Sequence, residues 1–127
     1  MAFTTEQLRA AAATKLYTIT PTSGGGAATV DQLSGSSANI AQVEINNTNN
    51  ASTTAYLKLY NVASGSVTLG TTTPYMVLPC PGGDTITYAL PKQTTFPSAL
   101  SVAMVTTGGT AGTTSMAKSV TVTILQG

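Results

Sequence analysis

Short apolar and β-branched runs, separated by joints rich in Gly, Pro and Asn, fill this chain from residue 16 to its end. About eight or nine such runs recur at intervals of roughly eight to twelve residues, with no helical periodicity between them. Parallel strands need long crossover connections, usually helices, which this spacing does not provide. The pattern therefore predicts an all-β fold, an antiparallel β-sandwich or jelly-roll-like domain of about eight strands.

The expected strands are defined by alternating apolar residues and by the turn residues that end them. The last two expected strands are joined by a polar loop at residues 106–115, and such loops often carry interaction sites, although tolerance of solvent explains them equally well. On these criteria, we expect strands at residues 16–20, 29–33, 41–45, 55–60, 67–69, 75–78, 85–90, 100–105 and 120–124.

Only residues 4–14 favour a helix. Thr4 and Gln7 have the spacing of a capping box, and the residues that follow have high helix propensity. The apolar stripe of this short helix is thin, so the helix must pack on its own domain or on a neighbouring subunit. We therefore expect an N-terminal helix and extended arm at residues 1–38, followed by a β-sandwich domain at residues 39–127.

The run at residues 55–60 predicts a strand with two different faces. One face is apolar, and the other places two tyrosines around a single lysine. The second face is either a solvated outer surface or a contact patch, because Tyr offers a large contact area at low entropic cost. Together with apolar residues near the N-terminus, this face makes up the predicted partner-binding residues, which are Phe3, Leu8, Leu16, Tyr17, Tyr56, Lys58 and Tyr60.

Ionisable side chains are scarce in this chain. It has no His, one Cys, four acidic and five basic residues, and a formal net charge of +1. Without His, no Ser-His-Asp or Cys-His arrangement can form, and a single Cys does not make a zinc site. We therefore expect no enzymatic activity, no metal and no cofactor. One alternative remains, a glycosidase pair drawn from carboxylates that are widely separated in sequence: Glu6, Asp31, Glu44 and Asp84.

The charge balance and the hydropathy also limit the expected partners. No basic stripe is present to compensate several phosphates, so we do not expect nucleic acid as a partner. No apolar run approaches the roughly 18 residues that a membrane helix needs, and the first residues do not form a secretory signal. A near-neutral surface rich in Thr and Ser carries little charge repulsion, which is typical of a protein that functions in an assembly.

An ordered set of strings occupies the second half of the chain. They are YLKLYN at residues 56–61, GTTTP at 70–74, PCPGG at 79–83, ALSVA at 99–103 and a Thr- and Gly-rich loop before a final valine-containing strand. This set, spanning about 70 of the 127 residues, resembles small structural proteins of tailed bacteriophages. The resemblance implies a β-sandwich virion protein, and it brings no catalytic residues.

The resemblance further implies a capsid decoration or cement protein, bound outside the head at junctions of major capsid subunits. We expect it to be made in the host cytoplasm and to cap three-fold sites as a homotrimer, through strand edges or arms. Many copies would then bind the lattice by avidity. The alternatives are a tail or baseplate component, including a host-receptor-binding module, and a secreted adhesive β-sandwich, which the missing signal disfavours.

Overall fold

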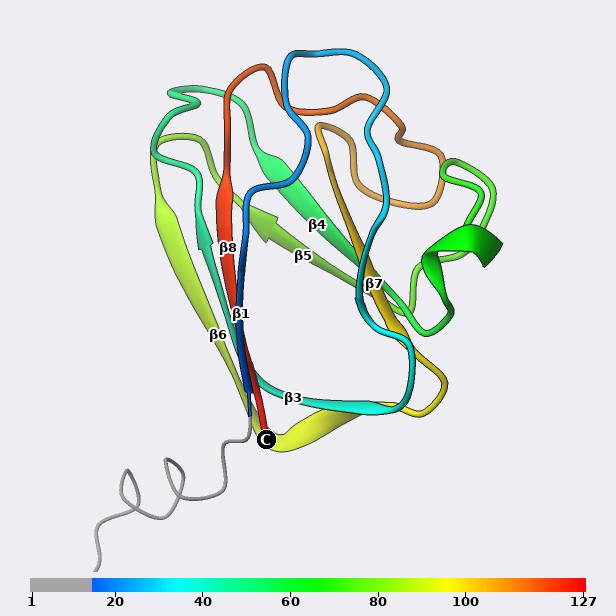
Figure 1. Cartoon of the computed structure of the whole chain (residues 1–127). Coiled ribbons are helices and arrows are strands. Elements are labelled where there is room, and N and C mark those ends of the chain that lie inside the picture. The colour runs from blue at the N-terminus through cyan, green and yellow to red at the C-terminus, as the bar shows by residue number, and fades with distance from the viewer. Residues whose placement is uncertain (1–14) are drawn as a thin grey trace, which may run out of the picture.

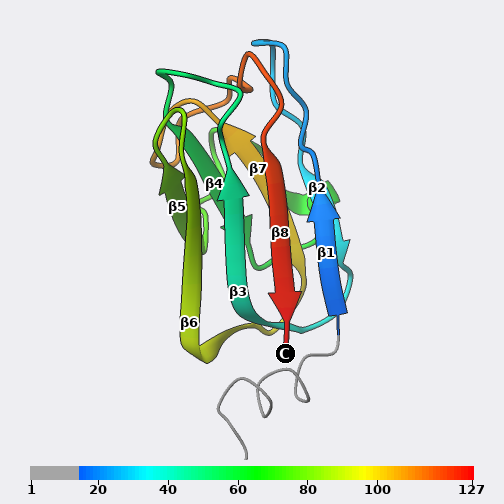
Figure 2. The same ribbon diagram turned by 90° about the vertical axis from the view of Figure 1, so that its left-hand side faces the viewer.

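Eight strands form two four-stranded sheets (Figures 1 and 2). The computed structural model describes residues 15–127, apart from the side chains of residues 91–93. The strands are β1 (Lys15–Ile19), β2 (Asp31–Ser34), β3 (Ala38–Asn46), β4 (Ala55–Tyr60), β5 (Met76–Cys80), β6 (Thr85–Phe96), β7 (Leu100–Val105) and β8 (Thr121–Gln126). Sheet 1 has the order β1-β8-β3-β6 and sheet 2 the order β2-β7-β4-β5, with every neighbouring pair antiparallel. The predicted all-β fold with antiparallel sheets is confirmed.

One hydrophobic core lies between the two sheets. Along each strand, alternate side chains point inward because successive residues of a strand face opposite sides of its sheet. Sheet 1 contributes residues such as Val43 and Ile124, and sheet 2 contributes residues such as Leu57 and Val102, all of them 0% exposed. The period-two alternation in the sequence therefore arises from burial of one face of each strand in a shared core.

The strands pair in a nested order, from the outermost two in sequence to the innermost two. β1 pairs with β8, β2 with β7, β3 with β6 and β4 with β5, and these pairs alternate between sheet 1 and sheet 2. Two further pairings, β3 with β8 and β4 with β7, join the pairs within each sheet. Each sheet therefore requires strands from both halves of the chain.

The predicted extent of the N-terminal arm needs correction over residues 15–38. β1 pairs with β8 along its full length, and β2 is a strand of sheet 2. The glycine-rich segment between them is also held in place, because the Gly24 N–H donates to the Met116 carbonyl oxygen at 2.7 Å. These residues belong to the domain because their backbone groups find partners in the sheets and loops. The predicted helix at residues 4–14 lies outside the described residues.

The run at residues 67–69, predicted as a strand, forms a turn instead. The Thr71 and Thr72 N–H groups both donate to the Thr68 carbonyl oxygen, at 2.9 and 2.8 Å, and Gly70 follows with a φ of 91°. A single 3-10 turn, η1 (Ser64–Ser66), precedes it. Within the described residues, no helix is long and apolar enough to cross a membrane.

Two buried asparagines tie together the loops at one end of the domain. The Nδ2 group of Asn47 donates to the carbonyl oxygens of Thr53 and Cys80, at 2.9 and 3.1 Å. The Nδ2 group of Asn50 donates to Asn47 Oδ1 at 2.9 Å and to the Lys118 carbonyl oxygen at 3.0 Å. The asparagine run that the sequence marks as a polar loop is thus a structural element, whose buried side chains donate hydrogen bonds to backbone carbonyls of neighbouring segments.

Candidate interaction surface

The predicted aromatic face of β4 is not at the surface. Lys58 and Tyr60 are 0% and 1% exposed, and Tyr56 is half-buried. β4 lies between β7 and β5 within sheet 2, and β7 is buried along its entire length, on both faces. Lys58 and Tyr60 are therefore not available for the predicted contact patch, because loops of the chain cover them on the outer face of sheet 2, whereas Tyr56 keeps part of its surface exposed.

Residues 106–115 form part of this cover, and Lys58 holds them. Its Nζ donates to the carbonyl oxygens of Gly112 and Thr110, at 2.9 and 3.2 Å. A Cβ built on Gly108 would lie 3.0 Å from the Tyr56 ring, so the loop backbone runs close over that tyrosine. Burial lowers the pKa of the Lys58 amine. The loop predicted as a possible interaction site thus packs on sheet 2.

The far end of β4 is covered as well. Ser101 lies opposite Tyr60 on β7, and its Oγ donates to the Val62 carbonyl oxygen at 2.7 Å. The Tyr60 hydroxyl has no hydrogen-bond partner among the described residues, and burial raises its pKa. The outer face of sheet 2 is therefore a second buried layer, which holds two polar side chains of β4.

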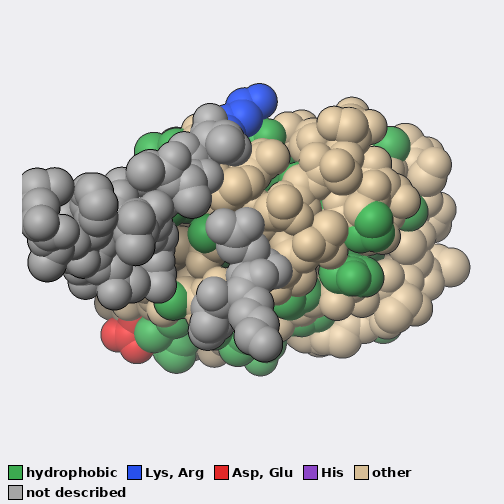
Figure 3. Space-filling view, turned by 90° about the horizontal axis from the view of Figure 1, so that it is seen from below, with side chains coloured by type: hydrophobic (Ala, Val, Ile, Leu, Met, Phe, Trp, Pro, Cys, Tyr) green, Lys and Arg blue, Asp and Glu red, His purple; other side chains and the backbone are tan. Residues whose placement is uncertain are grey.

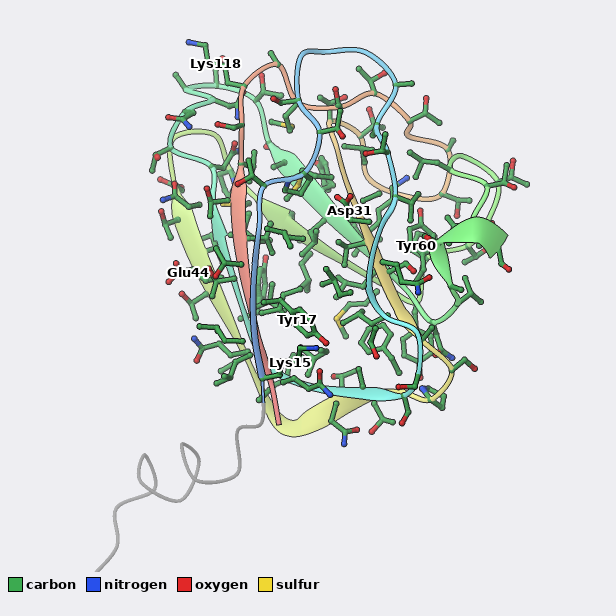
Figure 4. All side chains as sticks on the ribbon, in the orientation of Figure 1. Lys15, Tyr17, Asp31, Glu44, Tyr60 and Lys118 are labelled. Atoms are coloured by element: carbon green, nitrogen blue, oxygen red, sulfur yellow. The ribbon has the colours of Figure 1, made fainter. Side chains whose placement is uncertain are left out.

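The predicted contact residues near the N-terminus divide into three cases. Phe3 and Leu8 lie outside the described residues. Leu16 is 61% exposed on the outer side of sheet 1. Tyr17, its neighbour on β1, points between the sheets, packs against the core and donates from its hydroxyl to Gln126 Oε1 at 3.1 Å (Figure 4). Leu16 therefore remains a candidate contact residue, whereas Tyr17 is a packing residue.

None of residues 15–127 covers the outer face of sheet 1, and Figure 2 looks directly onto this sheet. Between the core-facing residues of β1, β8, β3 and β6, the outward side chains are exposed or half-exposed. We call this surface the open face. The strand registers arrange it in three rows across the sheet: Leu16, Leu125, Gln42 and Ala89; then Thr18, Thr123, Glu44 and Thr87; then Thr121, Asn46 and Thr85.

The open face is rich in threonine and nearly uncharged. Among the residues whose side chains are described, Glu44 is its one charged side chain, placed between Thr123 and Thr87 in the middle row, and it projects away from sheet 2 in Figure 4. Leu16 and Leu125 lie opposite each other near the end where β1 begins. Figure 3 looks onto that end of the molecule, and few of the described side chains visible there are charged. A surface of this kind suits broad contact with another protein surface.

Of the open face, sequence patterns predicted only Leu16 as a contact residue. A signal for the rest is present in the three Thr-x-Thr strings at residues 18–20, 85–87 and 121–123, since such spacing places both hydroxyls on one face of a strand. The strings do not reveal which sheet is covered by loops. That information depends on contacts between segments far apart in the chain, such as Lys58 with Gly112.

The carboxylates considered as a catalytic pair are dispersed over the fold. Glu44 lies on the open face of sheet 1, Asp31 begins β2 in sheet 2, and Asp84 precedes β6. Glu6 lies outside the described residues. Within residues 15–127, no group of three or more His, Cys, Asp or Glu side chains is placed to hold a metal ion. The arrangement therefore directs attention to the open face rather than to a reacting centre.

Because of Cys80, the stability of the domain should depend on pH in the alkaline range. Its buried thiol donates to the carbonyl oxygens of Ile45 and Asp84, both at 3.4 Å, and burial raises its pKa above the ordinary value of 9.0. Above pH 9 the unfolded thiol loses its proton while the folded thiol keeps it. The free energy of unfolding should therefore fall as the pH rises, by up to about 1.4 kcal/mol per pH unit.

The measurement is urea unfolding between pH 7 and 10, compared with Cys80→Ala. This variant keeps Lys58 and Tyr60, whose pKa values are also shifted by burial, so that their effects cancel in the difference. We expect the difference in free energy of unfolding between the unsubstituted protein and Cys80→Ala to be constant up to pH 9 and to change above it. Parallel curves throughout the range would contradict the prediction.

Comparison of this chain with protein-family models, with curated proteins and with solved structures finds no match.

Proposed function

We propose that this chain is a non-enzymatic structural protein of a bacteriophage virion, a capsid decoration or cement protein. In this proposal it binds outside the head, at junctions of major capsid subunits, and stabilises the lattice. The observation that carries the proposal is the open face, a broad sheet surface with little charge that residues 15–127 leave uncovered while they cover the other sheet. A protein that packs among other subunits needs such a surface.

The strand order supports the proposal at the level of the fold. Nested pairing of β1 with β8, β2 with β7, β3 with β6 and β4 with β5, alternating between two sheets, is the order expected of a β-sandwich of jelly-roll type. Jelly rolls occur in viral capsid domains and also in lectins and cupins, so the fold is compatible with a virion role without requiring it. We assign the domain to this architecture as part of the proposal.

A homotrimer is the proposed assembled form. A cap on a three-fold junction matches the symmetry of its site when it is itself three-fold. Each copy then buries a modest area, and strength comes from many simultaneous contacts. The open face supports self-association because its single carboxylate, Glu44, creates little repulsion between copies.

The test is the copy number of the chain in purified particles of the virus that encodes it, measured by quantitative mass spectrometry. A ratio to the major capsid subunit near one, or near one third, is expected of a cement protein. A ratio of a few per cent or less would instead assign the chain to the tail or baseplate, the alternative in which a receptor becomes the partner. Absence from the particles would overturn the virion role altogether.

Binding to capsids should depend only weakly on salt. With four acidic and five basic residues in the whole chain, few ion pairs are available for screening. We expect the dissociation constant for decorating bare capsids to change by less than about threefold between roughly 50 and 300 mM NaCl. The measurement is co-sedimentation of the purified protein with capsids. A loss of binding over this range would show that the contact is made by charged groups elsewhere.

A further inference from the structure

We propose that residues 1–14 of one copy dock on the open face of a neighbouring copy. In this contact Arg9 pairs with Glu44, and Leu8 covers the apolar end of the face formed by Leu16 and Leu125. The inference rests on the self-association included in the proposed function, but it does not depend on capsid binding. It identifies both the surface and the segment that hold the copies together.

The apolar end of the open face is incompletely buried within one copy. Leu16 is 61% exposed and is one of two large hydrophobic side chains exposed in the described part of the chain. It lies opposite the half-exposed Leu125 on β8, so the two form one apolar spot. Covering this spot with another apolar side chain is favourable because it removes nonpolar surface from water. Leu8 and Phe3 are the large apolar side chains that residues 1–14 supply besides Met1.

The segment carries one basic side chain, Arg9, and one acidic side chain, Glu6, and the basic one is opposite in charge to the face. Glu44 is the one charged side chain in the described rows of the open face, and it is half-exposed in the middle row. Residues 1–14 contain a single basic side chain, Arg9, directly after Leu8. An arginine can pair bidentately with a carboxylate, and here threonine hydroxyls flank that carboxylate on both sides. The pair would therefore fix the register of the segment on the sheet.

The neighbouring copy is favoured over the same copy because of where the segment joins the domain. Residue 14 leads directly into β1, an edge strand of sheet 1. Lys15 is two strand spacings and three residues from Glu44, roughly 14 Å across the sheet. To reach the face of its own copy, the segment would have to reverse direction within Ala12-Ala13-Thr14-Lys15, which contains none of the Gly, Pro, Asn or Asp residues typical of tight turns.

Donation of one segment and acceptance of another makes a head-to-tail contact. Contacts of this type close into rings when the rotation between copies permits it. Three such contacts close the proposed homotrimer, and every copy then has its open face filled and its segment bound. The partner of the open face is thus a second copy of this chain.

The test uses the full-length protein in solution, in the absence of capsids, with sedimentation analysis at micromolar concentration. Leu8→Asp on the segment and Leu16→Asp on the face should each weaken the trimer at least on the order of tenfold. Two variants serve as controls and should leave the trimer unchanged. Gln7→Asp places the same charge beside Leu8, and Tyr75→Asp alters the other exposed large hydrophobic residue, which is 54% exposed.

A charge exchange tests the register. Arg9→Glu and Glu44→Arg should each weaken the trimer, and the double variant, in which the two charges are exchanged, should restore it to within about threefold of the original dissociation constant. If the double variant lost as much trimer affinity as the two single variants lose together, the pairing of Arg9 with Glu44 would be overturned. Circular dichroism of each variant separates weakened assembly from failed folding.

Mixing the two defective chains distinguishes exchange between copies from docking within one copy. A Leu16→Asp chain keeps a working segment, and a Leu8→Asp chain keeps a working face, so their mixture should form a one-to-one heterodimer visible by native mass spectrometry. A mixture that stays monomeric would overturn exchange between copies, as would a monomeric unsubstituted protein at all concentrations. Because no capsid is used, failure here is separate from failure of the cement function, which the copy number in particles tests.

Discussion

Replacement of Asn47 by Asp should lower the free energy of unfolding by about 3 kcal/mol or more. Asn47 is 0% exposed, and its Nδ2 group donates to the carbonyl oxygens of Thr53 and Cys80. An ionised Asp has no donors, so it would leave both carbonyls unpaired and place a negative charge against them. Protonation of the new carboxyl would supply only one donor in place of two, at the further cost of a raised pKa.

The measurement is urea unfolding of Asn47→Asp against the unsubstituted protein. Asn46→Asp is a matched control in the adjacent position. Asn46 is exposed, and its Oδ1 only accepts hydrogen bonds, from the Thr48 N–H at 3.1 Å and the Thr48 hydroxyl at 2.7 Å. A carboxylate can accept the same bonds. The free energy of unfolding of Asn46→Asp should therefore stay within about 0.5 kcal/mol of that of the unsubstituted protein. Equal losses in both variants would contradict the role assigned to Asn47.

Replacement of Lys58 by Met should destabilise the domain by about 1–2 kcal/mol and loosen residues 106–115. Met retains most of the apolar side chain packed in sheet 2 but removes the donors to Gly112 and Thr110. The variant also no longer buries a charged amine, which offsets part of the stability lost with these hydrogen bonds. The expected decrease in the free energy of unfolding is therefore moderate. Hydrogen exchange should therefore quicken in residues 106–115 while β3 and β8 keep their protection.

Lys118→Met is the matched control for this variant. Lys118 is exposed, and the bond it contributes to Asn50 comes from its backbone, so the free energy of unfolding should change by less than about 0.5 kcal/mol. If Lys58→Met were as stable as the control and its loop equally protected, the two hydrogen bonds to the loop would not be what holds it in place.

The sequence predicted the strands of the two sheets better than it predicted the turns and loops between them. Alternation within a strand is a local signal, so the strand at residues 41–45 lies within β3 and the strand at residues 55–60 coincides with β4. The run at residues 67–69 has apolar ends, but three residues are too few for an alternating pattern to distinguish a strand from a turn. There the i to i+3 and i to i+4 hydrogen bonds of Thr68 determine the conformation.

The candidate surface was harder to predict than the fold. The alternating pattern of β4 indicates an inner and an outer face, but it does not say that residues 106–115, some 50 positions later, return to bury the outer one. Lys58 resembles an exposed lysine until this contact is known, because lysines are rarely fully buried. For the same reason, the Thr-x-Thr strings predict an outward row without revealing that sheet 1 is the sheet left open.

The position of β8 has a consequence for how the protein is made. β8 is synthesised after the other seven described strands, yet it lies between β1 and β3, and it joins β1 to the rest of sheet 1. Pairings that span nearly the whole chain form slowly, since the loop they close is long. A nascent or truncated copy cannot assemble this sheet, and it therefore lacks the open face. Only chains synthesised through residue 126 can therefore present that surface, because its middle rows need the outward side chains of β8.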